Sequence, residues 1–181
     1  PGEGGWFRSV ARISADHGIP VHAPDDVNHA IWVERVRDMA PDALFSAHYR
    51  RMIGADMLDV CPNRCYNIHA SLLPKYRGRC PINWVLINGE TETGVTLHHM
   101  TVAADAGDIV GQTAVAIDED DTAATLTASI VEATGTMLDE VLHDGERLLL
   151  GARRGGRRQR RGGRGAAPPG QRKHDGQTHP R

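Results

Sequence analysis

Residues 67–74 read Asn-Ile-His-Ala-Ser-Leu-Leu-Pro, and this stretch predicts where the fold places its functional site. Its first three residues end a short apolar strand that begins at Cys65, and the remainder opens a loop over residues 71–81. In open α/β sheets, ligands bind beyond the carboxyl ends of the strands, so polar groups at this point are expected to face a crevice. Asn67 and His69 are two residues apart on a strand, which points both side chains to the same face.

Outward from this stretch, short apolar strands alternate with helices. Strands are predicted over residues 20–22, 43–47, 65–69, 95–100 and 109–117. Helical spacing of apolar residues predicts helices from Trp6 to Gly18, from a cap at Asn28 to Pro41, and over residues 55–60, 82–88 and 122–143. This alternation predicts an α/β fold with a mainly parallel open sheet and flanking helices.

Charge is divided unevenly along the chain. Residues 151–181 contain nine Arg, one Lys and one Asp, so the net charge of −2 combines −11 in residues 1–150 with +9 in the tail. An acidic body has no surplus of positive charge for gripping a phosphate backbone. Nucleic acid is therefore not an expected partner of residues 1–150, which contain enough apolar residues for one globular domain.

The cysteines and the hydropathy pattern bear on the compartment. Cys61, Cys65 and Cys80 are an odd number in a chain without a signal peptide, which favours a reduced, cytoplasmic location over a disulfide framework. No second cysteine pair follows Cys61 and Cys65 at a zinc-finger spacing, so we expect ordinary buried thiols and no metal. Membrane insertion is not expected, because no apolar run approaches the roughly 20 residues of a span.

Asn67 and His69 alone leave two interpretations open. They combine an amide donor with a group that can take or give a proton near neutral pH. A buried histidine with satisfied hydrogen bonds, beside a turn asparagine, is the commoner meaning of such a pair. The choice between these interpretations depends on the longer pattern around them.

The longer pattern resembles the folate-dependent formyltransferases. After residues 67–74 it continues with Tyr-Arg-Gly at 76–78, Pro81, Trp84, Gly89, Gly-Val-Thr-Leu-His at 94–98, and Asp-x-Gly-x-Ile at 105–109. The order is long and specific, and the resemblance covers roughly residues 1–150. It implies a Rossmann-like formyltransferase fold and 10-formyltetrahydrofolate as co-substrate, with no metal.

Three segments resemble one subgroup, the formyltransferase domains of bifunctional polymyxin-resistance enzymes: residues 75–79, 83–86 and 88–94. That subgroup formylates the amine of UDP-4-amino-4-deoxy-L-arabinose, which contributes to lipid A modification and polymyxin resistance. The alternative is a methionyl-tRNA formyltransferase, although those enzymes typically carry Trp where Tyr76 stands. The expected partners are thus two small molecules, a folate and a UDP-amino sugar, and the parent protein could form a homo-oligomer.

The resemblance also implies roles for individual residues. Asn67 would donate a hydrogen bond to the charged oxygen that forms when the amine attacks the formyl carbon. His69 would transfer a proton to the leaving folate nitrogen, and Asp105 would pair with His69, fix its tautomer and raise its pKa. Without the resemblance, Asp105 would be interpreted as a turn residue. Folate contacts are implied at Arg51, Met52, Ile53, Arg79, Thr101, Val102, Ala103, Ala104 and Asp105.

The sequence departs from the family pattern at both ends. The family's first strand, the following helix and the second strand would precede Pro1, so residues 1–150 are expected to be a catalytic domain incomplete at its N-terminus. We expect the 181-residue chain alone to be insoluble or partly unfolded, and inactive. Residues 151–181 have only alanines as apolar residues, cannot bury a core, and are expected to be a disordered basic tail.

The abrupt change near residue 150 is interpreted as the product of a reading-frame shift in GC-rich DNA, because Arg, Gly, Ala and Pro have codons built from G and C. A native disordered terminus is the second interpretation, and an RNA-binding Arg/Gly arm the third. Such arms usually carry Phe or Tyr for stacking on bases, whereas residues 151–181 contain no aromatic side chain apart from His174 and His179. Truncating the tail would abolish RNA binding under the third interpretation only.

Resequencing the source DNA tests this interpretation. We expect a single-base insertion or deletion near residue 150 to restore family-like sequence downstream. If no such change does so, the frame-shift interpretation is wrong.

Overall fold

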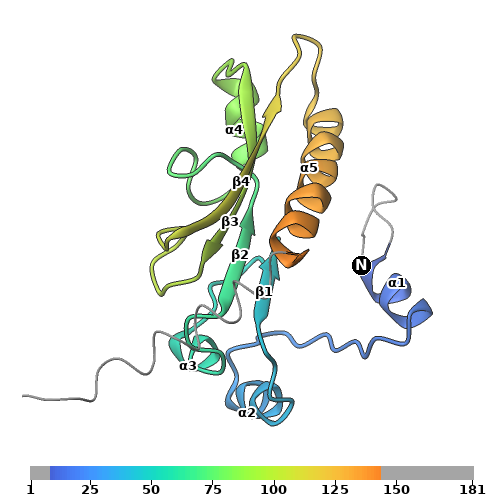
Figure 1. Cartoon of the computed structure of the whole chain (residues 1–181), viewed down its shortest axis with the longest axis vertical. Coiled ribbons are helices and arrows are strands. Elements are labelled where there is room, and N and C mark those ends of the chain that lie inside the picture. Colours follow the sequence, from blue (N-terminus) through green and yellow to red (C-terminus); the bar gives the residue numbers. More distant parts are fainter. Residues whose placement is uncertain (1–8, 144–181) are drawn as a thin grey trace, which may run out of the picture.

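The strands of the chain assemble into one four-stranded sheet, with helices over one face and at both ends (Figure 1). The computed structural model describes residues 9–143. In chain order the elements are α1 (Val10–Asp16), α2 (Ala30–Asp38), β1 (Leu44–Ala47), α3 (Ala55–Leu58), β2 (Cys65–His69), α4 (Pro81–Ile87), β3 (Glu92–His99), β4 (Ile109–Ala116) and α5 (Ala123–His143).

The sheet is mixed, in the order β1-β2-β3-β4. β1 runs parallel to β2, whereas β2–β3 and β3–β4 are antiparallel. The α/β fold with an open sheet and flanking helices is confirmed, but within residues 9–143 the sheet is not mainly parallel. The reason lies in the connections, because only a crossover over the sheet face makes neighbours parallel. α4 stands at the end of the sheet, and residues 100–108 join β3 to β4 without a helix (Figure 1).

Most predicted elements are confirmed, but one strand and one helix cap are wrong. The strand predicted over residues 20–22 is absent, because these residues pair with no strand among those described. Asn28 does not cap α2; His29 is the N-cap residue, and the Asn28 side chain binds the loop after β1 instead. α1 begins only at Val10, and Trp6 and the tail beyond residue 150 lie outside the described residues.

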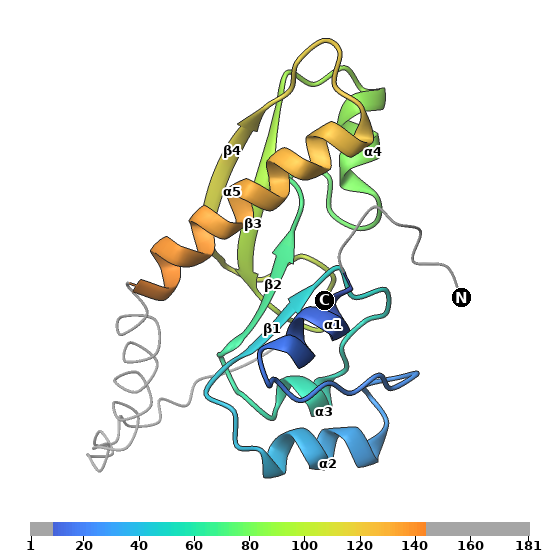
Figure 2. The same cartoon turned by 90° about the vertical axis from the view of Figure 1, so that its right-hand side faces the viewer.

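The hydrophobic core lies between the sheet and α5, which crosses one face of the sheet diagonally (Figure 2). Its members are Tyr66, Ala70, Val85, Val95, Leu97, Leu126, Ile130 and Met137. On β3, Val95 and Leu97 point into this core, so the alternation of a strand sends Thr96 and His98 to the opposite face. None of the helices within residues 9–143 is long and apolar enough to cross a membrane.

Gly107 allows the loop between β3 and β4 to lie against the end of β3. A Cβ atom built on Gly107 would overlap the His99 carbonyl, and the His99 amide donates to the Asp108 carbonyl over 2.9 Å. The glycine of the Asp-x-Gly-x-Ile motif is therefore required for close packing of backbone on backbone. This packing places Asp105, two residues earlier, above the polar face of the sheet.

Truncating a core residue tests this architecture. The Leu126 side chain on α5 is fully buried, so Leu126→Ala should lower the free energy of unfolding of the complete protein by about 3 kcal/mol in urea titrations. Leu142→Ala on the same helix is the matched control, because Leu142 is 56% exposed, and it should change stability by less than about 0.5 kcal/mol. Equal losses in the two variants would contradict the packing of α5 described above.

Candidate active site

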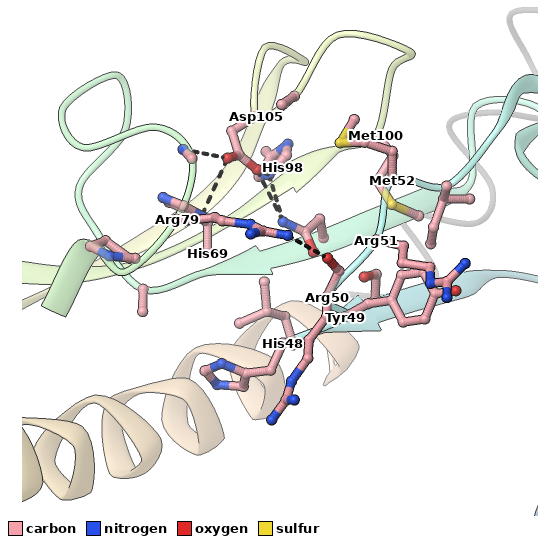
Figure 3. A pocket seen from close by; sticks show the side chains of 18 of the residues that line it. His48, Tyr49, Arg50, Arg51, Met52, His69, Arg79, His98, Met100 and Asp105 are labelled. Atoms are coloured by element: carbon pink, nitrogen blue, oxygen red, sulfur yellow. Dashed lines mark hydrogen bonds and ion pairs between the residues drawn. The ribbon is translucent and has the colours of Figure 1, made fainter. Parts of the chain in front are cut away.

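The carboxylate of Asp105 lies at the centre of a polar cluster at the end of β2 (Figure 3). Oδ2 accepts a hydrogen bond from the Gly78 amide over 2.9 Å and lies 3.6 Å from His69 Nδ1. Oδ1 accepts from Asn67 Nδ2 over 3.3 Å and lies 3.4 Å from His98 Nε2. Asp105 adopts a left-handed backbone, with φ at 47°, and its side chain is 14% exposed. One largely buried carboxylate therefore connects β2, β3 and the loop after β2.

His69 has an acceptor on each side of its ring. Nε2 donates to the Tyr76 carbonyl over 2.8 Å, and Nδ1 faces Asp105 at 3.6 Å. A carbonyl and a carboxylate both accept hydrogen bonds, so each ring nitrogen faces a group to which it can donate when it carries a proton. The Nε2 contact is a full hydrogen bond, whereas the Nδ1 contact is too long to be one. Nδ1 is therefore the less firmly held of the two nitrogens.

Asn67 and His98 are partners across the β2–β3 ladder. His98 Nδ1 donates to the His99 carbonyl over 2.9 Å, and its Nε2 lies 3.2 Å from Asn67 Nδ2 and 3.4 Å from Asp105 Oδ1. The second hydrogen of the Asn67 amide faces Asp105. The Asn67 amide nitrogen thus lies between His98 and Asp105, and both distances are at the long end of the hydrogen-bond range.

An open cleft of about 800 Å³ lies next to this cluster and is lined by twenty-three residues. The three predicted catalytic residues all line it, and they are in mutual contact through Asp105. Most of the predicted folate-contacting positions also line the cleft: Arg51, Met52, Ile53, Arg79, Thr101, Ala103 and Ala104. Val102 is the exception, because it is 69% exposed and is not among the lining residues.

The wall of the cleft at Arg51–Ile53 is held by Asn28. Its amide donates to the Met52 carbonyl over 2.9 Å and accepts from the Gly54 amide over 2.6 Å. Asp26 lies 3.3 Å from Arg51 Nη1, and the backbone amide of Asn28 is the main cause that lowers the pKa of the Asp26 carboxyl. A pair of residues before α2 therefore fixes the segment that follows β1.

The loop after β2 rests on Thr96, which is fully buried. Its hydroxyl donates to the Ser71 carbonyl over 2.6 Å and accepts from the Leu73 amide and from Gln112 Nε2, over 3.2 and 2.8 Å. These bonds satisfy the buried backbone of the Ser-Leu-Leu segment. They also fix the start of the loop that carries Gly78 and Arg79 to the cleft.

His98 is the member of the cluster that sequence reasoning did not identify. In the sequence it is the last residue of the Gly-Val-Thr-Leu-His stretch at 94–98, and no role was assigned to it. The signal was available, because Val95 and Leu97 are apolar, and strict alternation sends His98 to the face of Asn67 and His69. What could not be read from the sequence is the register that places His98 opposite Asn67.

The cysteines divide into two environments. Cys61 and Cys65 are buried and donate to backbone carbonyls, as expected, and burial raises the pKa of Cys65 to about 11. Cys80 is exposed and lines the cleft at the start of α4, with φ at 57°. Among the described residues, no group of three or more His, Cys, Asp or Glu side chains is arranged to hold a metal ion.

Comparison with known proteins agrees with this architecture. Residues 19–142 match the model of the formyl transferase family. A phosphoribosylglycinamide formyltransferase from Bacillus halodurans is 31% identical, with a TM-score of 0.70 over 76% of this chain and 74% of that chain. A glycinamide ribonucleotide transformylase from Symbiobacterium toebii is 30% identical, with a TM-score of 0.62 over 67% of this chain and 60% of that chain.

A sugar N-formyltransferase from a Shewanella species is 26% identical, with a TM-score of 0.64 over 79% of this chain and 53% of that chain. The fold and the cleft at the end of β2 thus define a formyltransferase architecture. The chain belongs to the formyl transferase family. The activity of that family is folate-dependent formyl transfer, with 10-formyltetrahydrofolate as co-substrate.

The unequal exposure of the cysteines generates a prediction. At pH 8, a thiol-reactive dye should label only one of these three cysteines rapidly in the folded, complete protein, because Cys61 and Cys65 are buried. Because the pKa of Cys65 is about 11, only roughly one Cys65 thiol in a thousand would be ionised at pH 8. Cys80→Ser should abolish the rapid phase, whereas Cys61→Ser should leave it unchanged. A rapid phase that persists in Cys80→Ser would contradict the cleft geometry.

Proposed function

We propose that this protein transfers the formyl group of 10-formyltetrahydrofolate to the amine of a UDP-linked amino sugar, UDP-4-amino-4-deoxy-L-arabinose. The observation that carries the chemistry is the cluster of Asn67, His69 and Asp105 beside the cleft. The acceptor is inferred from residues 75–79, 83–86 and 88–94, which resemble the amino-sugar subgroup. The match to the Shewanella sugar N-formyltransferase supports the same class of acceptor.

The cleft suits a folate. Its volume of about 800 Å³ lies within the range of small-molecule sites. Met52, Ile53 and Met100 supply apolar walls for a flat heteroaromatic ring, and Arg51 and Arg79 supply positive charge for the carboxylates of the glutamyl tail. Arg79 is held by a 3.2 Å bond from its guanidinium to the Arg50 carbonyl, which leaves other donors available.

Asn67 would stabilise the negative charge that develops on the formyl oxygen as the amine attacks. Its Nδ2 hydrogens face His98 and Asp105 at 3.2 and 3.3 Å, so one of these long bonds would be exchanged for a bond to the formyl oxygen. The hydrogen bond from Asn67 to the formyl oxygen would strengthen as negative charge accumulates on that oxygen. One donor of this kind lowers the activation barrier by about 3 kcal/mol. His98 would keep the amide in the orientation that presents Nδ2 rather than the oxygen.

As the new C–N bond forms and the bond to the folate nitrogen breaks, His69 would supply the proton that the leaving folate nitrogen needs and would regain one from the proton that the attacking amine loses. Its Nε2 proton is held by the Tyr76 carbonyl at 2.8 Å, whereas Nδ1 is only loosely opposed by Asp105 at 3.6 Å. The Nδ1 proton is therefore the one that can be transferred. Asp105 would keep the ring oriented and its positive charge stabilised before the transfer.

A second candidate acceptor is glycinamide ribonucleotide. It is favoured by the phosphoribosylglycinamide formyltransferase of Bacillus halodurans, which is 31% identical with a TM-score of 0.70. The chemistry at Asn67, His69 and Asp105 would be the same with either amine. Only the residues that contact the acceptor would differ.

Substitution of the two β2 residues tests the mechanism. In the complete protein, His69→Ala and Asn67→Ala should each lower kcat by about 100-fold or more, because each removes a group that acts in the transition state. The circular dichroism spectrum should stay unchanged. Near wild-type turnover in either variant would remove that residue from the mechanism.

An acceptor assay tests the substrate. The complete protein would be offered 10-formyltetrahydrofolate with UDP-4-amino-4-deoxy-L-arabinose, glycinamide ribonucleotide or charged initiator tRNA, one at a time. We expect a kcat/KM at least about 100-fold higher for the UDP-amino sugar, because an acceptor that leaves buried polar groups unpaired is strongly rejected. A preference for glycinamide ribonucleotide would establish the second candidate instead.

A further inference from the structure

Tyr76 occupies an unusual position in the loop after β2. It is a non-glycine residue with a left-handed backbone, at φ 57°, and its carbonyl is the acceptor for His69 Nε2 at 2.8 Å. A bulky residue holds this conformation only where its surroundings impose it. The hydrogen bond from His69 Nε2 to the Tyr76 carbonyl therefore depends on the contacts that fix the conformation of Tyr76.

The Tyr76 side chain is held by the turn after α4. Its phenol donates to Glu90 Oε1 over 2.7 Å and accepts from Asn88 Nδ2 over 3.0 Å. A short hydrogen bond from a hydroxyl to a carboxylate is charge-assisted and stronger than a neutral one. The bond from Tyr76 is the main cause that lowers the pKa of the Glu90 carboxyl, and Lys75, 3.5 Å away, adds to it.

Glu90 is itself fixed by the end of α4. The Glu90 amide donates to the Val85 carbonyl over 3.0 Å, and the amide of Gly89, at φ 63°, donates to the Leu86 carbonyl over 3.1 Å. This pair of bonds, with a glycine in the left-handed conformation, is a Schellman motif. The Val85 side chain is fully buried in the core. A continuous set of contacts thus leads from the core to the acceptor carbonyl of His69.

Neither Tyr76 nor Glu90 lines the cleft. A change in either side chain would therefore remove no direct contact with a ligand bound there. Its effect on the reaction would pass through the Tyr76 carbonyl and His69.

We propose that Glu90 and the Tyr76 phenol form a positioning pair for His69, which holds the Tyr76 carbonyl against Nε2 from outside the cleft. The inference rests on the proposed role of His69 in proton transfer. The Tyr76–Glu90 hydrogen bond fixes the Tyr76 carbonyl, which keeps the proton on His69 Nε2. The transferable proton is then the one on Nδ1. A shift of the carbonyl would leave the ring free to rotate away from Asp105.

Three variants separate positioning from binding. Tyr76→Phe removes one oxygen and Glu90→Ala removes its acceptor, whereas Glu90→Gln keeps an oxygen that can still accept. In the complete protein, Tyr76→Phe and Glu90→Ala should each lower kcat by about 10-fold with the KM for the folate within about twofold. Glu90→Gln should stay within about threefold of the wild type, and the double variant Tyr76→Phe/Glu90→Ala should be no slower than either single one. Glu132→Gln, on an exposed part of α5, is the matched control and should leave kcat unchanged.

A second readout does not require turnover. The ¹⁵N signals of the His69 ring, identified by their loss in His69→Gln, should shift in Tyr76→Phe and Glu90→Ala, because Nε2 loses its fixed acceptor. They should not shift in Glu132→Gln. If Tyr76→Phe folds poorly, Glu90→Ala and Glu90→Gln carry the same comparison.

The outcomes distinguish this inference from the proposed function. If His69→Ala is inactive while Tyr76→Phe and Glu90→Ala keep full kcat, the positioning pair is wrong and the role of His69 stands. A lowered kcat with unchanged His69 signals would also overturn the inference. If His69→Ala keeps full turnover, His69 is removed from the mechanism and the positioning pair is wrong with it, whereas a wild-type protein that formylates no acceptor amine would refute the proposed function.

Discussion

The carboxylate of Asp105 is the interaction on which the arrangement of this site depends. It is largely buried, and it contacts the Gly78 amide, His69, His98 and Asn67. Burying a carboxylate without partners costs much free energy, so Asp105 can occupy this position only because these groups contact it. One charge thereby joins two strands and two loops that are far apart in the sequence.

The sheet makes this convergence possible. The antiparallel pairing of β2 and β3 places Asn67 opposite His98, and the close approach of Gly107 to His99 turns the following loop back over the strands. The face of β3 that carries His98 also carries Thr96, whose hydroxyl fixes the start of the loop after β2. The same two strands use their other face for the core beneath α5. Packing on one face therefore determines the geometry of the chemistry on the other.

Much of this could be predicted from local patterns. The strand over residues 65–69 was predicted with its observed bounds, and the helix predicted over residues 122–143 with a start one residue early. Asn67 and His69 were placed on one face from strand periodicity alone, and the structure confirms it, since both reach Asp105. Long, strongly periodic segments are decided by their own side chains, which is why they can be read from sequence.

What could not be predicted depends on pairing between distant segments. The direction of β3 and β4 follows from where α4 and the β3–β4 loop lie, which no single segment specifies. His98 joined the site only through its register with Asn67. Asn28 carried the signature of a helix cap, but it holds the wall of the cleft at Met52 and Gly54 because those backbone groups needed partners.

The central claim is that the Asp105 charge organises the catalytic groups, and the kcat of Asp105→Asn tests it most directly. The substitution keeps the size of the side chain and removes its charge. The account predicts a fall in kcat of about 100-fold or more with the fold intact, because His69 loses the partner that orients its ring. Asp108→Asn, in the same loop but outside the cleft, should turn over at the wild-type rate. Wild-type turnover and an unchanged pH–rate profile in Asp105→Asn would contradict the account and reduce Asp105 to a turn residue.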